Sequence, residues 1–222
     1  MHKFEKPSVT ADIVIFTIKD NDLKVLLVKR KIAPFKDTWA LPGGFVRIDE
    51  SLEDAAKREL EEETGVKDVY LEQLYSFGNP KRDPRGRVIT IAYMALVNSE
   101  NIKLKATTDV SDAQWFSIKK IPQLAFDHKK ILDYSLKRLK WKFEYTTVAF
   151  SLLPKKFAIS QIQKIYETVF NKNFDKRNFA KKIVSLNILK EEVIKEDFSH
   201  RLPMLYSLNK NIAPPEILIC TL

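Results

Sequence analysis

Glutamates and one arginine gather between residues 50 and 63 in a pattern that suits metal-assisted phosphate chemistry. Glu59, Glu62 and Glu63 stand at i, i+3 and i+4, so they share one face if the segment is helical. Carboxylates this close repel one another unless a cation lies between them, and their hard oxygens favour Mg²⁺ or Mn²⁺. Such a site could neutralise phosphate charge and activate a water that attacks a phosphoanhydride. Without a metal, the segment would be a solvated helix face held by pairs such as Arg58 with Glu62.

The segment between residues 44 and 66 resembles the Nudix box, which is written G-x5-E-x7-R-E-U-x-E-E-x-G-U with U aliphatic. All fixed positions of that motif match this chain, at Gly44, Glu50, Arg58, Glu59, Leu60, Glu62, Glu63, Gly65 and Val66. The resemblance implies that Glu59, Glu62 and Glu63 ligate the metal ion, often together with the carbonyl of Gly43. It also implies that Arg58 orients these glutamates. Glu50 would support the loop before the helix.

The general base of a Nudix enzyme often lies outside the box, and its position varies. Asp109 and Asp112 are the candidates in this chain. A box can also bind metal and ligand while turning over poorly. The sequence therefore leaves both a hydrolase and a sensor without catalysis open.

Three arginines, Arg82, Arg85 and Arg87, lie in one short segment between two predicted strands. Guanidinium groups suit bidentate recognition of phosphate. The segment resembles the corresponding part of ADP-ribose-type Nudix proteins, which implies a nucleoside diphosphate sugar such as ADP-ribose as the ligand. Arg30 is a further phosphate candidate, and Trp39 is a candidate for stacking on a base. The alternative is a basic hairpin that only faces solvent.

These side chains need a scaffold, and the first part of the chain predicts one made mainly of strands. Residues 20–22 read as a turn, and apolar, β-branched runs predict strands at residues 11–18, 23–30, 69–77, 88–97 and 114–118. Ser51 can cap the helix of the box, and Gly65 can end it. Leu52, Ala56 and Leu60 give that helix an apolar stripe.

Glycine is absent from the sequence after residue 86, and the later part turns helical. Helical spacing of apolar residues predicts one helix over residues 127–142 and a second that begins with a capping box of Ser160 and Gln163. A third helix is expected after Asp175. Two short strands are expected beyond it, at residues 193–194 and 204–206. Three helices followed by a small hairpin are typical of a winged helix domain.

The third of these helices carries a basic face opposite an apolar stripe of Phe179, Ile183 and Leu186. A recognition helix reads DNA from such a face, with Arg or Asn on base edges and Lys on phosphates. The candidates here are Lys176, Arg177, Asn178, Lys181 and Lys182. Arg201, on the expected wing, could reach the DNA backbone or minor groove. The alternative is a basic helix face without a function.

This half of the chain resembles the C-terminal winged helix of Nudix-related transcriptional regulators. Those regulators sense ADP-ribose or a sugar-derived ligand with their Nudix domain. The resemblance implies double-stranded DNA as a partner and a homodimer, because paired winged helices read paired half-sites.

The composition agrees with a cytoplasmic protein that binds polyanions. The chain has 222 residues, a formal net charge of +9 and a sequence pI of about 9.4, which biases it toward nucleic acid, anionic lipid or phosphorylated ligands. No apolar run approaches the roughly 18 residues that a membrane span needs, and the N-terminus lacks the apolar stretch of a secretory signal. A lone Cys220 excludes an internal disulfide, which favours a reducing compartment.

We therefore expect an α+β protein with two domains. An N-terminal Nudix α/β/α sandwich with a mixed sheet is expected over residues 1–142, and a C-terminal winged helix-turn-helix domain over residues 143–222. The expected function is metal-dependent hydrolysis of ADP-ribose or a related nucleoside diphosphate derivative, fused to ligand-responsive regulation of transcription. The alternative is a non-catalytic sensor that regulates genes of NAD or sugar metabolism. No membrane association is expected.

Overall fold

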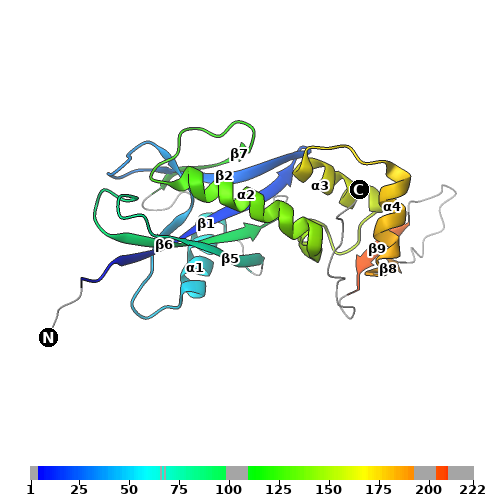
Figure 1. The fold of residues 1–222 in the computed structure, drawn as a ribbon, viewed down its shortest axis with the longest axis horizontal. Coiled ribbons are helices and arrows are strands. Elements are labelled where there is room, and N and C mark those ends of the chain that lie inside the picture. The colour runs from blue at the N-terminus through cyan, green and yellow to red at the C-terminus, as the bar shows by residue number, and fades with distance from the viewer. Residues whose placement is uncertain (1–4, 66, 68, 99–109, 193–203, 210–222) are drawn as a thin grey trace. The chain divides into compact units, whose positions relative to one another are not determined.

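The computed structural model describes residues 5–65, 67, 69–98, 110–192 and 204–209 of the chain. The chain divides into two compact units. The first consists of residues 1–17 and 23–136, and the second of residues 18–22 and 137–222. Figure 1 shows the sheet of the first unit in blue and green and the later helices of the second in yellow and orange.

A seven-stranded mixed sheet forms the body of the first unit. Its strands are β1 (Ser8–Lys19), β2 (Asp22–Arg30), β3 (Trp39–Ala40), β4 (Gly43–Phe45), β5 (Tyr70–Phe77), β6 (Val88–Leu96) and β7 (Val110–Ser117). The order is β3-β2-β1-β6-β5, with β4 paired to β1 and β7 paired to β2. β1 and β6 are parallel, whereas β4, β3, β7 and β5 each pair in antiparallel fashion with their neighbours.

The strands expected from apolar runs are all present, and the mixed sheet is confirmed. The expected turn is also present, since Asp20 and Asn21 adopt φ angles of 57° and 56°. Short polar side chains tolerate this left-handed conformation, which suits a tight hairpin. The sequence does not predict β3 and β4, because strands of two and three residues show no alternation of apolar and polar side chains.

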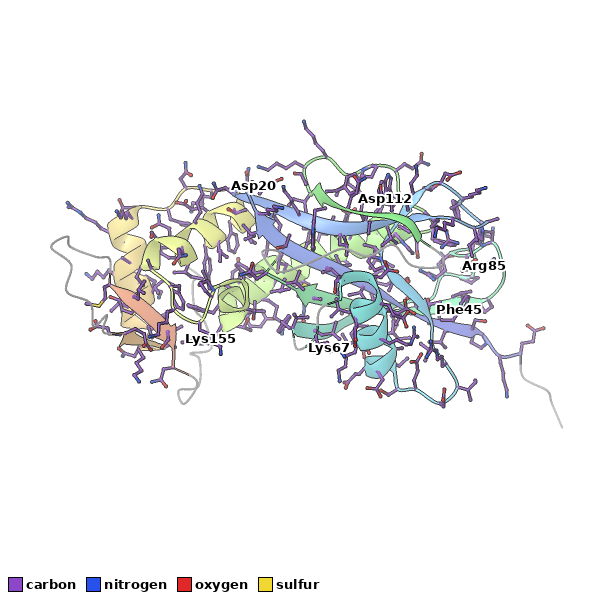
Figure 2. The ribbon with its side chains drawn as sticks, turned by 180° about the vertical axis from the view of Figure 1, so that it is seen from behind. Asp20, Phe45, Lys67, Arg85, Asp112 and Lys155 are labelled. Atoms are coloured by element: carbon purple, nitrogen blue, oxygen red, sulfur yellow. The ribbon has the colours of Figure 1, made fainter. Side chains whose placement is uncertain are left out.

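Helix α1 (Leu52–Thr64) carries the glutamates of the box, and its ends match the prediction. The side chain of Ser51 accepts a hydrogen bond from the Asp54 amide, and Gly65 ends the helix with a φ of 69°. The buried residues Ala56 and Leu60 pack into the core of the sheet. Within the first unit, helix α1 lies on one face of the sheet and the first half of α2 (residues 128–136) on the other, as the two opposite views show (Figures 1 and 2).

The second unit consists mainly of short helices and one hairpin. Helix α2 (His128–Tyr145) begins in the first unit and continues into the second. It is followed by the 3-10 helix η2 (Thr147–Leu152), α3 (Ile159–Phe170), α4 (Lys176–Ser185), β8 (Leu189–Glu192) and β9 (Leu205–Leu208). The aromatic side chains of Phe143, Tyr166 and Phe179 are fully buried, and the ring of Tyr166 contacts those of both Phe143 and Phe179. The expected order of helix, helix, helix and hairpin is confirmed.

Three details of this unit differ from the expectation. Helix α3 begins after Ala158 and not at Ser160, because the side chain of Gln161 accepts the Ala158 amide at 2.8 Å. Gln163 instead donates to Glu167 and to the carbonyl of Phe174, so it belongs to the helix body. The first strand of the hairpin is β8, which ends at residue 192, whereas the expected strand at residues 193–194 lies outside the described residues. Helix α2 ends at Tyr145 rather than at residue 142.

Among the residues that the structure describes, none of the helices has both the length and the apolar character that a bilayer crossing requires.

Candidate functional site

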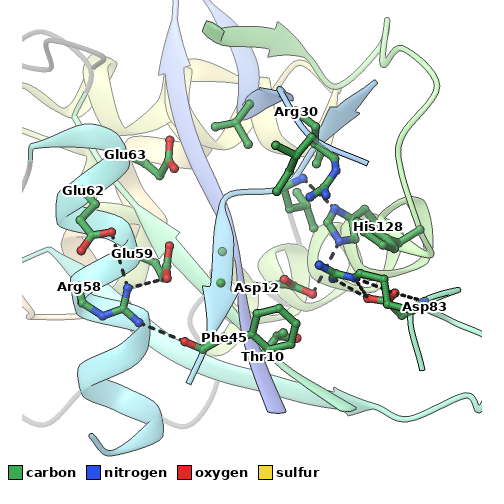
Figure 3. Close-up of a pocket in the computed structure, with 18 of the residues that line it drawn as sticks. Thr10, Asp12, Arg30, Phe45, Arg58, Glu59, Glu62, Glu63, Asp83 and His128 are labelled. Carbon is green, nitrogen blue, oxygen red and sulfur yellow. Dashed lines mark hydrogen bonds and ion pairs between the residues drawn. The ribbon is translucent and has the colours of Figure 1, made fainter. Parts of the chain in front are cut away.

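A pocket of about 470 Å³ opens in the first unit, with β4 between two charged walls (Figure 3). Helix α1 supplies one wall with Glu59, Glu62 and Glu63. The other wall combines residues from β1, the end of β2, the loop before β6 and the start of α2. Its charged or titratable members are Asp12, Arg30, Arg82, Asp83, Arg85 and His128. The pocket thus offers acidic oxygens on one side and guanidinium groups on the other.

Arg58 is the centre of the acidic wall. Its guanidinium binds Glu50 through two contacts of 2.8 and 3.0 Å, and Glu59 at 2.6 Å. Glu62 lies 3.6 Å away, and the carbonyl of Phe45 accepts a further bond. Arg58 therefore contacts or approaches three carboxylates at once, and the orienting role that the resemblance implies for it stays a prediction. Glu50 also accepts the amide of Arg47, which ties the loop before α1 to the helix.

The environment shifts the acidity of two of these glutamates in opposite directions. The hydrogen bond from Arg58, with the Arg47 amide, lowers the pKa of Glu50 to about 2. Burial raises the pKa of Glu59, against the opposing effect of the Arg58 hydrogen bond. Glu50 is therefore a fixed anion, whereas the charge of Glu59 depends on the cations around it.

Neither of the two glycines of β4 has room for a side chain. A Cβ added to Gly44 would lie 2.2 Å from Glu59 Oε1, and one added to Gly43 would lie 2.4 Å from the carbonyl oxygen of Ala11. Gly43 also adopts a φ of 150°, which other residues rarely reach. Glycine at position 44 therefore lets the carboxylate of Glu59 approach β4, and glycine at position 43 lets β4 lie close to β1.

These acidic side chains suit a hard dication by chemistry, although they do not form a closed cage. Glu59, Glu62 and Glu63 supply carboxylate oxygens from one helix face. The absence of a side chain at Gly44 lets the Glu59 carboxylate lie against β4. Within the described ranges, no group of three His, Cys, Asp or Glu side chains is close enough to hold a metal ion. Arg58 instead contacts Glu59 and approaches Glu62, so its positive charge offsets their repulsion.

The opposite wall contains a buried ionic network around Arg82. Its guanidinium forms a fork with Asp127, with contacts of 2.8 and 3.1 Å to Oδ1, and reaches Asp12 at 3.2 Å. The Arg82 side chain is only 3% exposed. Because two carboxylates surround it, Arg82 acts first as an internal counter-ion that joins β1 to the start of α2.

His128 ties this wall to the backbone before β4. Its Nδ1 accepts a hydrogen bond from the Leu41 amide at 2.9 Å, and its Nε2 lies 3.7 Å from Asp12. Burial lowers the pKa of His128, so the ring is neutral at pH 7 with its proton on Nε2. The ring therefore fixes the chain that leads into the two glycines.

Arg85 and Arg30 are the guanidinium groups nearest to aromatic rings in this pocket. Arg85 pairs with Asp83 at 2.7 Å, and its guanidinium lies over the rings of Phe45 and Phe126. Arg30 lies over the same Phe126 ring at 4.9 Å. Both arginines line the pocket, and their role as phosphate ligands stays a prediction.

The remaining candidates lie elsewhere. Arg87 donates to the carbonyl of Gly78, and Trp39 packs edge-on against Phe116; neither lines this pocket. Asp112 accepts a hydrogen bond from Gln114 in β7 and does not line it either. Asp109 and Val66 lie outside the described residues.

Sequence reasoning missed Asp12, Asp127, His128 and Phe126. Asp12 had a signal, because it interrupts an apolar run that reads as a buried strand. The others come from a segment 60 or more residues after the box, and only the fold brings them to it. The sequence favours Arg82 as a phosphate ligand, whereas in the structure its guanidinium binds the carboxylates of Asp127 and Asp12.

Helix α4 presents the other candidate site. Asp175 caps it through the Asn178 amide, and Phe179 and Ile183 are buried. The opposite face is exposed at Lys176, Arg177, Asn178 and Lys181, and half-buried at Lys182. Arg201 lies outside the described residues. The second unit therefore offers a cationic helix face next to a small hairpin.

Comparison with known proteins identifies both units. The model of the NUDIX domain matches residues 7–135, and the model of the NrtR DNA-binding winged helix domain matches residues 149–208. The ADPR responsive transcriptional repressor NtrR of Acinetobacter baylyi is 36% identical over 192 residues, which cover 85% of this chain and 76% of that protein. The ADP-ribose pyrophosphatase of Methanocaldococcus jannaschii is 43% identical over 138 residues, covering 61% of this chain and 75% of that one. The crystal structure of Shewanella oneidensis NrtR with a 27mer DNA is 35% identical, covers 90% of this chain and 93% of that chain, and superposes with a TM-score of 0.77.

Proposed function

The chain belongs to the Nudix family, and since its second unit also matches the NrtR winged helix domain, we propose that it is an ADP-ribose-responsive regulator of transcription. The Nudix domain binds ADP-ribose or a related nucleoside diphosphate derivative. The winged helix binds double-stranded DNA. The observation that carries the proposal is the similarity of nearly the whole chain to a repressor named for its response to ADP-ribose.

The pocket has the chemistry that this ligand requires. A diphosphate needs cations, and Arg30 and Arg85 line the pocket opposite the acidic wall. Phe45 and Phe126 add apolar surface beside them, which suits a nucleoside. The pocket volume of about 470 Å³ is of the size that small ligands occupy.

Hydrolysis of the ligand is a second proposed activity. It is supported by the complete box and by the similarity to a pyrophosphatase. Glu59, Glu62, Glu63 and the carbonyl of Gly43 would hold Mg²⁺ or Mn²⁺, which supplies positive charge to the phosphates and lowers the pKa of water. Arg58 orients the glutamates, and Glu50 holds Arg58 in place.

We divide the protein into a Nudix domain over residues 1–142 and a DNA-binding domain over residues 143–222, and we propose that it acts as a homodimer in the cytoplasm. In the second domain, Arg177 and Asn178 are the proposed base contacts. The proposed phosphate contacts are Lys176, Lys181, Lys182 and Arg201. A dimer presents two such helices to two half-sites of an operator.

One experiment tests both activities. Purified protein is bound to labelled operator DNA taken from upstream of its own gene, and ADP-ribose is titrated in with Mg²⁺ present. We expect the retarded band to change with ADP-ribose and not with ribose 5-phosphate. Release of AMP is followed in the same samples, with Glu62→Gln as the control for turnover.

The outcomes separate the two proposals. A change of the retarded DNA band with ADP-ribose, without AMP release, would support a sensor that has no hydrolase activity. AMP release without DNA binding at low salt would overturn the regulatory function. Absence of both would overturn the proposed ligand.

A further inference from the structure

The side chain of Arg85 is held from three directions at once. Its Nε and Nη2 form a fork with Asp83, at 3.0 Å to Oδ1 and 2.7 Å to Oδ2. The centre of its guanidinium lies 5.1 Å from the ring centroid of Phe45 and 5.5 Å from that of Phe126. Cations placed over aromatic faces at such distances are attracted to them. Arg85 is therefore fixed along one edge and against two rings.

Asp83 is built to hold this arginine. Its side chain is only 2% exposed, and its Oδ1 also accepts the backbone amide of Arg85 at 2.9 Å. A buried carboxylate is stable only where such partners satisfy it. Burial alone raises the pKa of Asp83, but the hydrogen bonds from Arg85 outweigh that effect and lower it. The carboxylate is thus charged throughout the neutral range.

One edge of the Arg85 guanidinium is left for a ligand. Its contacts use Nε and Nη2, and no hydrogen bond within the described part of the chain uses Nη1. The Arg85 side chain is 38% exposed and lines the pocket. Figure 2 shows Arg85 and Phe45 at the same end of the sheet. Because Asp83 already holds Nε and Nη2 while Nη1 is available, the guanidinium is a preorganised hydrogen-bond donor.

The neighbouring Arg82 gives the contrast. It forms the same kind of fork, with Asp127, but a second carboxylate from Asp12 also contacts it, and it is only 3% exposed. Arg82 is consequently part of the wall. Arg85 has one carboxylate partner, an Nη1 that no described hydrogen bond uses, and access to the pocket.

We propose that Asp83, Phe45 and Phe126 are positioning residues that fix Arg85 with its Nη1 toward one phosphate of the ligand. This inference rests on the proposed binding of a diphosphate in this pocket. Because the guanidinium is already held, it loses less conformational entropy when the ligand binds. Asp83 acts only through Arg85.

A double-mutant cycle on the full-length protein tests this claim. ADP-ribose and inorganic pyrophosphate, each with Mg²⁺, are titrated calorimetrically into wild type, Asp83→Asn, Arg85→Lys and the double variant. We expect each single variant to bind both probes about tenfold more weakly. We expect the double variant to bind no more weakly than Arg85→Lys alone, because the lysine has no fork for Asp83 to hold. Asp133→Asn is the control, since it removes an exposed carboxylate that pairs with Lys129.

A purely structural role for Asp83 predicts a different result. It would lower the affinity by the same factor in the Arg85→Lys background, and that additivity would overturn the proposal. Equal affinity of Asp83→Asn and wild type would overturn it as well. Where Asp83→Asn fails to fold, Phe45→Leu replaces it, because Phe45 is 47% exposed. We expect Phe45→Leu to weaken binding about threefold in the wild-type background and to have no further effect in the Arg85→Lys background.

The proposed function fails in a distinguishable way. Wild-type protein that binds pyrophosphate but not ADP-ribose would overturn the ligand and leave the role of Asp83 measurable with pyrophosphate. Wild-type protein that binds neither probe would overturn both inferences.

Discussion

Helices α1 and α4 both bury an apolar stripe and carry a charged face, but they balance those charges in opposite ways. Arg58 of α1 contacts Glu50, Glu59 and Glu62, so each of these carboxylates has a cationic neighbour inside the unit. On α4, Lys181 and Arg177 form no ion pair with any residue that the structure describes. The first helix thus holds its charged groups in fixed pairs beside the pocket, and the second leaves its charge to solvent or a partner.

This difference separates two kinds of recognition. A charge held by several neighbours has one position, which suits a small ligand of fixed shape. Unpaired lysines on an exposed face keep their mobility, which suits the regular phosphates of DNA and makes binding depend on salt. The two helices therefore predict different responses to mutation, salt and pH.

The largest expected effect is on the packing that supports α4. Phe179 is fully buried against Tyr166 and Phe174, so Phe179→Ala should cost about 3–5 kcal/mol of unfolding free energy. DNA binding should be lost while calorimetry still detects ADP-ribose. Val184→Ala, at an exposed position of the same helix, should change neither the unfolding free energy nor DNA binding. Loss of ADP-ribose binding in Phe179→Ala would show that the two units do not stand independently.

The next effect concerns the acidic wall of α1. Glu62 is 48% exposed in its side chain, so Glu62→Gln should fold normally. We expect turnover of ADP-ribose, where present, to fall about 100-fold, because one carboxylate of the proposed metal site loses its charge. Manganese titration followed by electron paramagnetic resonance should show weaker binding. DNA binding without ligand should stay unchanged, and a parallel loss there would contradict the separation of the two helices.

Gly44 tests how tightly the glutamates are held against β4. A Cβ at this position would lie 2.2 Å from Glu59 Oε1, so Gly44→Ala should displace that carboxylate and cost about 1–3 kcal/mol of stability. Gly78→Ala is the control, because its nearest neighbours lie 3.9 Å away. Denaturant unfolding of both variants measures the difference. Equal stability of the two variants would mean that the Glu59 carboxylate can move away from β4, which would contradict the fixed position inferred for it from its contact with Arg58.

The same contrast explains what the sequence could predict. The box specifies residue types at fixed spacing, so the helix, its Ser51 cap and its Gly65 end follow from local chemistry. The winged helix follows only from apolar spacing, which fixes the order of elements and leaves their ends uncertain. Gln161, and not Ser160, provides the hydrogen bond at the start of α3 for that reason.

The opposite wall of the pocket could not be predicted, because it is made by the fold. Asp127 and His128 are 80 or more residues after Leu41, yet His128 accepts the amide of Leu41. No local pattern marks such a pair. Arg82 and Arg85 look equivalent in sequence, and only burial by Asp12 and Asp127 makes one a wall and the other accessible.

A smaller effect is expected on the basic face of α4. Lys181 is exposed, so Lys181→Ala should leave stability unchanged and weaken DNA binding several-fold across all sequences. The slope of log affinity against log salt should flatten by about one unit. Lys164→Ala, an exposed lysine on α3, is the control with the same change of charge. An unchanged slope for Lys181→Ala would remove this face from the DNA contact.

The smallest expected effect is a pH dependence of stability, which should appear for the paired charges beside α1 and not for the unpaired charges of α4. The folded-state pKa of Glu50 is about 2, below its ordinary value of 4.5, because Arg58 and the Arg47 amide bind the carboxylate. Its contribution to stability is therefore complete above pH 4.5 and is lost as the pH falls toward 2. Urea unfolding should show a difference between wild type and Glu50→Gln at pH 7 that shrinks at pH 3. Glu61→Gln, which removes an exposed carboxylate beside Lys67, should show no such change. A difference for Glu50→Gln that is the same at both pH values would mean that shape, and not charge, holds Arg58, and the proposed distinction between the two helices would lose its electrostatic basis.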